Sequence, residues 1–233
     1  MNTRRRHLYQ SIGAVLAGVL VAPAVAIAQA VVGPGTVNST VTATSGTTTV
    51  VGNTTIDTGN NDGVWANGGD VLLDMNSPLA TPGAISVLSN ALSLHATSGV
   101  IAAPRGINLR VSGRGQALYA DGGTVSVFAG NVTSAGIGKL AGDTAGLIQM
   151  ANMRYNDPAL SSGMQGNGIG IDGTARVELS GFNRLYIGRT GNSFGLGVQG
   201  PMAKAVLSGT NQFTFQQPGA MGVYLYGGGQ LEI

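Results

Sequence analysis

The feature that most constrains the fold is a repeat near the C-terminal end of the chain. Three tetrapeptides, GIGI at 168–171, GLGV at 195–198 and GVYL at 222–225, recur at equal intervals of about 27 residues. Each of the first two is followed by an apolar run and by a Leu-Ser-Gly-x-Asn turn, at 179–183 and 207–211. A repeat of this length is typical of a solenoid, whose units bury their apolar side chains only by stacking on one another.

Each repeat contains three short runs of alternating side chains, separated by glycine and polar turns. Three strands per coil of about 27 residues predict a right-handed parallel β-helix, an all-β fold whose coils lie about 4.8 Å apart. The 39 glycines suit this fold, since its many turns need residues that reach positive φ. The alternation predicts two inward ladders, formed by Ile169, Leu196 and Val223 and by Ile171, Val198 and Leu225.

Residues 1–30 have the pattern of a signal peptide. Three arginines at 4–6 precede an apolar stretch at 12–21 that is short for a membrane span, and Ala-Gln-Ala at 28–30 matches a cleavage site. We expect cleavage after Ala30, with a retained membrane anchor as the alternative. The segment 3–8 is close to a twin-arginine signal, so export by that route and by the general secretory route both stay open.

Charge and composition exclude several classes of protein. The chain has 12 Lys and Arg and 10 Asp and Glu, and loss of the three arginines at 4–6 leaves nine positive residues against ten negative ones, a net charge of −1. No basic run follows, so the footprint of a nucleic-acid-binding protein is absent. The chain has no cysteine, which favours the periplasm or surface of a bacterium over a small disulfide-framed module.

The chain divides into three predicted regions. After the signal peptide, residues 31–62 are rich in Thr, Val, Ser, Gly and Asn without a clear repeat, and we predict an N-terminal cap of the solenoid. Residues 63–233 are predicted to form the β-helix, because 65–71 matches 119–125 at an offset of 54, twice the repeat. Residues 141–166 break the pattern and are predicted as a lateral loop. The last coil has two strands and lacks the third, as expected of a piece of a longer protein or of an end that a partner covers.

The acidic residues form no convincing site in the sequence. The stretch 167–174 is one imperfect copy of a calcium-binding nonapeptide, and Asp172 within it is interpreted as an ordinary turn residue. Asp70 and Asp74 are the nearest acidic pair, and in a strand they face the same side beyond bonding distance. We therefore predict no catalytic residue, no metal site and no cofactor.

Two further sets of polar residues are candidates for surface contacts. His95 is the only histidine after the signal peptide, and alternation within 92–96 places it outward, with no second histidine to complete a metal site. Arg176 and Lys204 occupy equivalent positions of successive coils and are predicted to stack outward, as are Arg184 and Gln212. Such a ladder would suit an acidic sugar or a surface partner, although solvated faces also have this pattern.

The signal peptide, the Thr/Ser/Gly-rich start and the coils GIGIDGTARVELSGFNRLYIG and GLGVQGPMAKAVLSGTNQF resemble the passenger region of pertactin-like bacterial autotransporters. The resemblance is one of repeat style over about 60–233. It implies a β-helix displayed at the cell surface or outer membrane, commonly for adhesion, with a C-terminal twelve-stranded outer-membrane barrel as anchor. This sequence departs from the pattern because it contains no barrel, no α-helical linker and no Arg-Gly-Asp tripeptide.

Three hypotheses of function follow. The first is a non-enzymatic, exported passenger fragment, an adhesin or display stalk that contacts a host or cell-surface protein or glycan, at the cell surface or in the periplasm. The alternative is a carbohydrate-active β-helix, a lyase or hydrolase of acidic polysaccharide. Three carboxylates within about 6 Å on one face would favour the enzyme. A structural fragment left by a disrupted reading frame is a third hypothesis.

Overall fold

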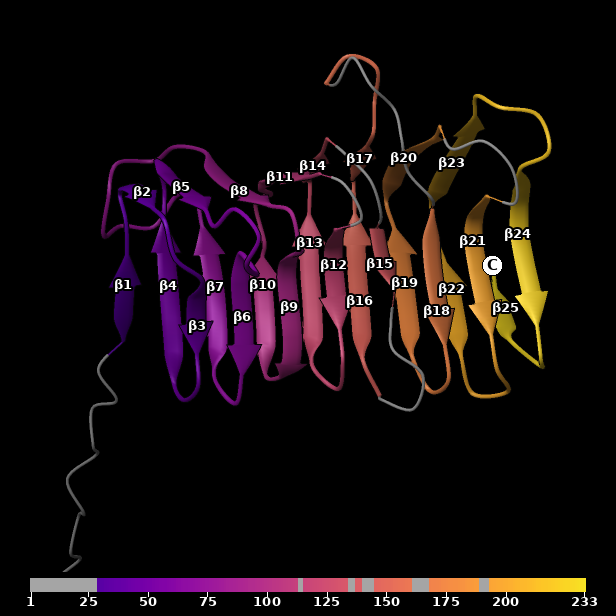
Figure 1. Cartoon of the computed structure of the whole chain (residues 1–233), viewed down its shortest axis with the longest axis horizontal. Coiled ribbons are helices and arrows are strands. Elements are labelled where there is room, and N and C mark those ends of the chain that lie inside the picture. Colours follow the sequence, from indigo (N-terminus) through magenta and orange to yellow (C-terminus); the bar gives the residue numbers. More distant parts are fainter. Residues whose placement is uncertain (1–28, 113–114, 134–136, 140–144, 161–167, 189–192) are drawn as a thin grey trace, which may run out of the picture.

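The computed structural model describes residues 29–112, 115–133, 137–139, 145–160, 168–188 and 193–233. The regular elements in these ranges are all strands, and they wind into a parallel β-solenoid with about 26 residues per turn (Figure 1). The predicted fold class and repeat length are confirmed. The predicted signal peptide lies outside the described residues except for its last two, and the described part of the chain holds no helix suited to crossing a membrane.

Three walls enclose the core, and strands of one wall recur as every third element. The first wall is one sheet, formed by β1 (Ala30–Val32), β4 (Thr47–Val51), β7 (Asp70–Asp74), β10 (Val100–Ala103), β13 (Thr124–Phe128), β16 (Leu147–Ala151), β19 (Arg176–Ser180), β22 (Lys204–Leu207) and β25 (Gln230–Glu232). The second wall is one sheet, formed by β2 (Gly35–Val37), β5 (Thr54–Asp57), β8 (Ile85–Ser89), β11 (Asn108–Val111), β14 (Asn131–Val132), β17 (Arg154–Tyr155), β20 (Phe182–Ile187) and β23 (Thr210–Phe215). The third wall consists of two sheets, formed by β3 (Val41–Ala43), β6 (Val64–Asn67), β9 (Leu92–Ser98) and β12 (Gln116–Ala120), then by β15 (Ile137–Lys139), β18 (Ile169–Asp172), β21 (Phe194–Gln199) and β24 (Met221–Tyr226).

The core is a stack of inward apolar side chains that match from coil to coil. Ile169 pairs with Leu196 and Leu196 with Val223, while Ile171, Val198 and Leu225 form the parallel column. Both predicted ladders are therefore confirmed. The members on β18 and β21 are buried, whereas those on β24, the last strand of the third wall, are 41 % and 47 % exposed.

The repeated Leu-Ser-Gly-x-Asn segments form the corner between the first and second walls. Gly181 and Gly209 have φ angles of 69° and 73°, which a residue with a side chain rarely adopts. The side-chain nitrogen of buried Asn183 donates to Asn211 Oδ1 at 2.8 Å, and its Oδ1 accepts from the backbone N–H of Met153 at 2.9 Å. These side-chain bonds tie successive corners together.

Two regions without a clear repeat in the sequence also supply strands to the walls. Residues 31–62 supply strands that continue all three walls, with Thr48 paired to Val71 and Val41 to Val64. Within the predicted lateral loop at 141–166, residues 147–151 and 154–155 instead form β16 and β17 of the regular coils. Ile148 and Met150 alternate inward and are buried, which makes this stretch a wall strand. Residues 156–160 do leave the stack, beside β17 (Figure 1), whereas 141–144 and 161–166 lie outside the described residues.

Candidate binding groove

Polar side chains line the outer surface of the second wall in register. Thr55 on β5 pairs with Ser86 on β8, Ser86 with Asn108 on β11, and Asn108 with Asn131 on β14. Because parallel coils place equivalent residues above one another, these four outward side chains form a column along the solenoid axis. A neighbouring outward pair, Leu88 and Arg110, runs beside it.

A groove of about 450 Å³ follows this column across four coils. It has the size of ligand pockets in proteins, which is roughly 300–1,000 Å³. Its lining consists of Thr55, Ser86, Val87, Leu88, Asn108, Leu109, Arg110, Asn131, Thr133 and Leu160. A smaller depression of about 150 Å³, which Arg110 also lines, adjoins it and includes Asp57, Asn90 and Ser112. The two share Leu88 and Arg110, so they form one continuous surface.

Several polar groups in the groove are only partly used by the protein. The side-chain nitrogen of Asn131 donates to Asn108 Oδ1 at 3.2 Å, and the Thr133 hydroxyl donates to the carbonyl of Leu109 at 3.2 Å. Within the described part of the chain, the Asn108 side-chain nitrogen and the Ser86 hydroxyl have no hydrogen-bond partner. These groups are therefore available to a polar ligand.

The segment after β17 contributes Leu160 to the lining of the groove. The position of this segment is fixed by Asp157, whose side chain is 6 % exposed. Its Oδ1 accepts from the backbone N–H of Ala159 at 2.9 Å, its Oδ2 accepts from Arg154 Nε at 2.9 Å, and its carbonyl accepts from the N–H of Leu160 at 2.8 Å. The backbone hydrogen bond, with the hydrogen bond and charge of Arg154, holds the pKa of the Asp157 carboxyl below its ordinary value.

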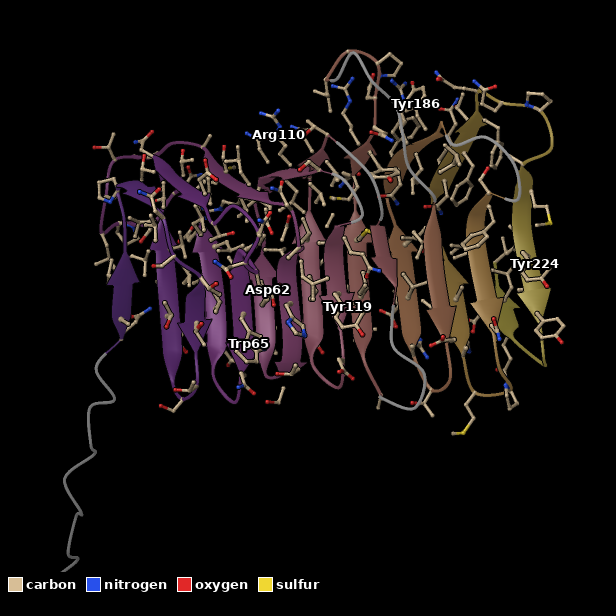
Figure 2. The ribbon with its side chains drawn as sticks, viewed as in Figure 1. Asp62, Trp65, Arg110, Tyr119, Tyr186 and Tyr224 are labelled. Atoms are coloured by element: carbon tan, nitrogen blue, oxygen red, sulfur yellow. The ribbon has the colours of Figure 1, made fainter. Side chains whose placement is uncertain are left out.

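Arg110 differs electrostatically from the other cations of the structure. It is exposed on β11 and projects from the second wall (Figure 2), and among the described residues no acidic group pairs with it. On the same wall, Arg154 is bound to Asp157, and the guanidinium of Arg184 lies 4.9 Å from the ring centroid of Phe182. The groove therefore contains a guanidinium, that of Arg110, with no acidic partner in the described part of the chain.

The third wall bears a different surface, a row of rings formed by Trp65, His95 and Tyr119. The ring centroids of Trp65 and His95 are 5.7 Å apart with nearly parallel planes, and those of His95 and Tyr119 are 5.3 Å apart edge to face. His95 Nδ1 lies 2.8 Å from Asp62 Oδ2, and its side chain is 14 % exposed. Figure 2 shows Asp62, Trp65 and Tyr119 close together on this wall. Burial, and then the charges of Asp121 and Asp172, raise the pKa of Tyr119.

The residues considered in the sequence occupy separate places. His95 faces outward as predicted, but it is packed between aromatic rings and paired with Asp62 rather than free on the surface. Asp70 and Asp74 lie at opposite ends of β7, where Asp70 accepts from the N–H of Val100 at 2.9 Å and Asp74 from that of Asn76 at 3.1 Å.

The predicted outward stacking of basic residues is confirmed, since Arg176 pairs with Lys204 and Arg184 with Gln212. Arg176 and Lys204, however, are bound to Glu178 and Glu232 at 2.6 Å, so their charges are already matched. Asp172 ends β18. Within the described ranges, no group of three or more His, Cys, Asp or Glu side chains is placed to hold a metal ion.

Sequence reasoning missed both the groove and the aromatic row. The row had a detectable signal, because the offset of 54 that relates Trp65 to Tyr119 places a further coil between them, and His95 occupies it. The groove had a weaker signal. Its column members are unequally spaced along the sequence from Thr55 to Asn131, so a fixed period does not align them.

Comparison with known proteins adds no relative to this description. No family model, no curated protein and no solved structure matches the chain. The functional hypothesis therefore depends on the residues and the geometry of the groove.

Proposed function

We propose that this chain is a non-catalytic, exported binding protein of the bacterial cell surface, in which the groove of the second wall holds a glycan. The observation that carries the proposal is the 450 Å³ groove, lined by amide and hydroxyl side chains and one guanidinium without a partner among the described residues. Sugars present many hydroxyl groups, and such groups are recognised by side chains that both donate and accept hydrogen bonds. A groove that crosses four coils suits an extended chain better than a compact molecule.

Within this proposal the solenoid acts as an autotransporter-type passenger, that is, an adhesin or display stalk. Its support is the parallel β-solenoid architecture together with the signal-like residues 1–30. Export is tested by producing the chain in a Gram-negative host, sequencing the mature N-terminus and probing intact cells with a protease. A mature form that begins at Val31 is expected, and cleavage on intact cells is expected when the chain is fused to an outer-membrane barrel. Retention in the cytoplasm would contradict this part of the proposal.

Glycan binding is tested by incubating the purified chain with an immobilised glycan array. Ser86→Tyr places a bulky side chain in the middle of the groove, and binding is expected to fall to background. Ala102→Tyr on β10 is the matched control, because it adds the same side chain to the outer face of the first wall. Both residues are half-buried on a strand, where an aromatic side chain is well tolerated.

Three outcomes of the array would refute groove binding: no signal for the unmodified chain, an unchanged signal for Ser86→Tyr, or an equal loss for both variants. Circular dichroism melting of each variant shows whether the fold is intact. The same incubations, checked for new reducing ends or unsaturated sugars, test the non-catalytic part of the proposal, for which no release of product is expected.

A further inference from the structure

We infer that the groove binds an acidic glycan, with the carboxylate of one sugar unit against Arg110. This inference rests on the proposed glycan-binding function and adds the chemical class of the ligand. Arg110 lines both the larger groove and the adjoining depression, so a glycan that occupies the surface must pass its guanidinium.

Arg110 differs from the other basic residues in its lack of a partner among the described residues. Among the described residues outside 137–139, every other lysine or arginine side chain has a partner in the protein, which is an acidic side chain for all except Arg184. These pairs are Arg105 with Asp74, Arg154 with Asp157, Arg176 with Glu178, Arg184 with Phe182, and Lys204 with Glu232. An anion that binds Arg110 displaces no such pair, and the guanidinium fork matches a carboxylate with two parallel hydrogen bonds.

The larger groove is suited to the charged unit. None of the described lining residues is acidic, so none of them repels a carboxylate. The Asn108 side-chain nitrogen and the Ser86 hydroxyl lie on the strands β11 and β8 that form its floor, and both can donate to sugar oxygens. Along this column, coils about 4.8 Å apart repeat at a distance comparable with the length of one hexose unit.

The adjoining depression is suited to an uncharged unit. Asp57 lines it together with Arg110, Asn90 and Ser112, and a second carboxylate placed there would be repelled by the Asp57 carboxylate. Sugar hydroxyls, in contrast, can donate to Asp57. The surface therefore favours a glycan in which an acidic unit is followed by a neutral one over a polymer with a carboxylate on every unit.

The test uses isothermal titration calorimetry of the purified chain with two defined probes. Hyaluronan oligosaccharides alternate acidic and neutral units, oligogalacturonates have a carboxylate on every unit, and each is compared with its carboxyl-reduced form. Carboxyl reduction of hyaluronan is expected to raise Kd roughly ten- to hundredfold, the range of a charge-assisted hydrogen bond. Arg110→Gln is expected to raise the Kd for hyaluronan by the same factor, and carboxyl reduction should then cause no further rise. Arg110→Lys is expected to raise the Kd by an intermediate factor.

Two further variants make the result specific. Arg105→Gln removes the same charge from an exposed arginine outside the groove and should change Kd by less than about twofold. Asp57→Asn should strengthen binding of oligogalacturonate and leave hyaluronan nearly unchanged.

Equal binding of the acidic and carboxyl-reduced forms would overturn the inference and leave the proposed function standing. Equal losses for Arg110→Gln and Arg105→Gln would also overturn it, because the attraction would then be one of overall charge. If neither probe binds while the array shows groove-dependent binding of neutral glycans, the inference fails alone. If the array is blank as well, the proposed function fails with it.

Discussion

The repeated glycines Gly168, Gly195 and Gly222 allow a graded test of the stacking. A Cβ added to Gly168 would lie 1.8 Å from the carbonyl oxygen of Gly195 in the next coil. Added to Gly195, it would lie 2.7 Å from Phe213 Cδ1 and 2.8 Å from the carbonyl oxygen of Gly222. Added to Gly222, it would meet nothing within 4 Å. Three substitutions at equivalent positions therefore differ only in what lies above them.

The expected cost follows from these distances. At Gly168 the neighbouring atom belongs to the backbone, so the next coil must move, and this strains the hydrogen bond of 2.8 Å from the Gly168 N–H to the carbonyl of Phe194. Overpacking of about 1–3 kcal/mol and one weakened hydrogen bond of about 1 kcal/mol give about 2–4 kcal/mol for Gly168→Ala. Gly195→Ala should cost about 1–2 kcal/mol. Gly222→Ala should be neutral or stabilising by up to about 1 kcal/mol, because alanine restricts the unfolded chain.

Urea denaturation of the purified chain, followed by far-ultraviolet circular dichroism, measures the three variants side by side. The expected order of midpoints is Gly168→Ala lowest, then Gly195→Ala, with Gly222→Ala at or above the unmodified chain. The slope of each transition must stay constant, since partial unfolding of a repeat protein would change it. A Gly222→Ala variant as unstable as Gly168→Ala, or a harmless Gly168→Ala, would refute the coil-to-coil contact as the cause.

Three further predictions concern buried polar and titratable groups. Asn183→Ala should lower the free energy of unfolding by about 1–3 kcal/mol in urea denaturation, because the buried N–H of Met153 loses its acceptor; a neutral result would contradict the corner ladder. Asp157→Asn should cost about 1–3 kcal/mol at neutral pH. The pKa of the Asp157 carboxyl is lower in the folded state than its ordinary value, so ionised Asp157 stabilises the fold above pH 3.8, and this stabilisation is lost as pH falls through the lowered pKa. Asp157→Asn should therefore lose less stability than the unmodified chain on acidification. The pKa of the Tyr119 phenol is raised in the folded state, so neutral Tyr119 stabilises the fold below pH 10.0, and this stabilisation is lost as pH rises through the raised pKa. A titration of the absorbance at 295 nm should show one phenol that ionises at higher pH than the others and that is missing from Tyr119→Phe.

The part of the fold that could be predicted is the part where coil length is constant. Between β18 and β24 successive coils are equally long, so Ile169, Leu196 and Val223 align by counting alone. On the first wall Thr124 pairs with Leu147 and Leu147 with Arg176, so the second of these coils is longer than the first. Turns of unequal length cause this variation, and it hides β16 and β17 within a stretch whose sequence suggests a loop.

The candidate groove could not be predicted for a related reason. Arg110 is recognisable as a charge in the sequence, but its lack of a partner among the described residues depends on which side chains the neighbouring coils place beside it. That placement follows from register, and register follows from turns whose length the alternation of side chains does not specify. The position of Leu160 in the lining also depends on the hydrogen bonds of Asp157, which join residues two and three apart within an irregular segment.

Because one outward column supplies the floor of the groove, the length of the groove can change only by whole coils. Each coil contributes one residue to the column, namely Thr55, Ser86, Asn108 or Asn131. The backbone hydrogen bonds between coils are the same whatever the outward side chain is. Duplication or loss of one complete winding would lengthen or shorten the candidate groove by one residue of this column and leave the other coils in register. Gene duplication could therefore change the length of the groove without a new core.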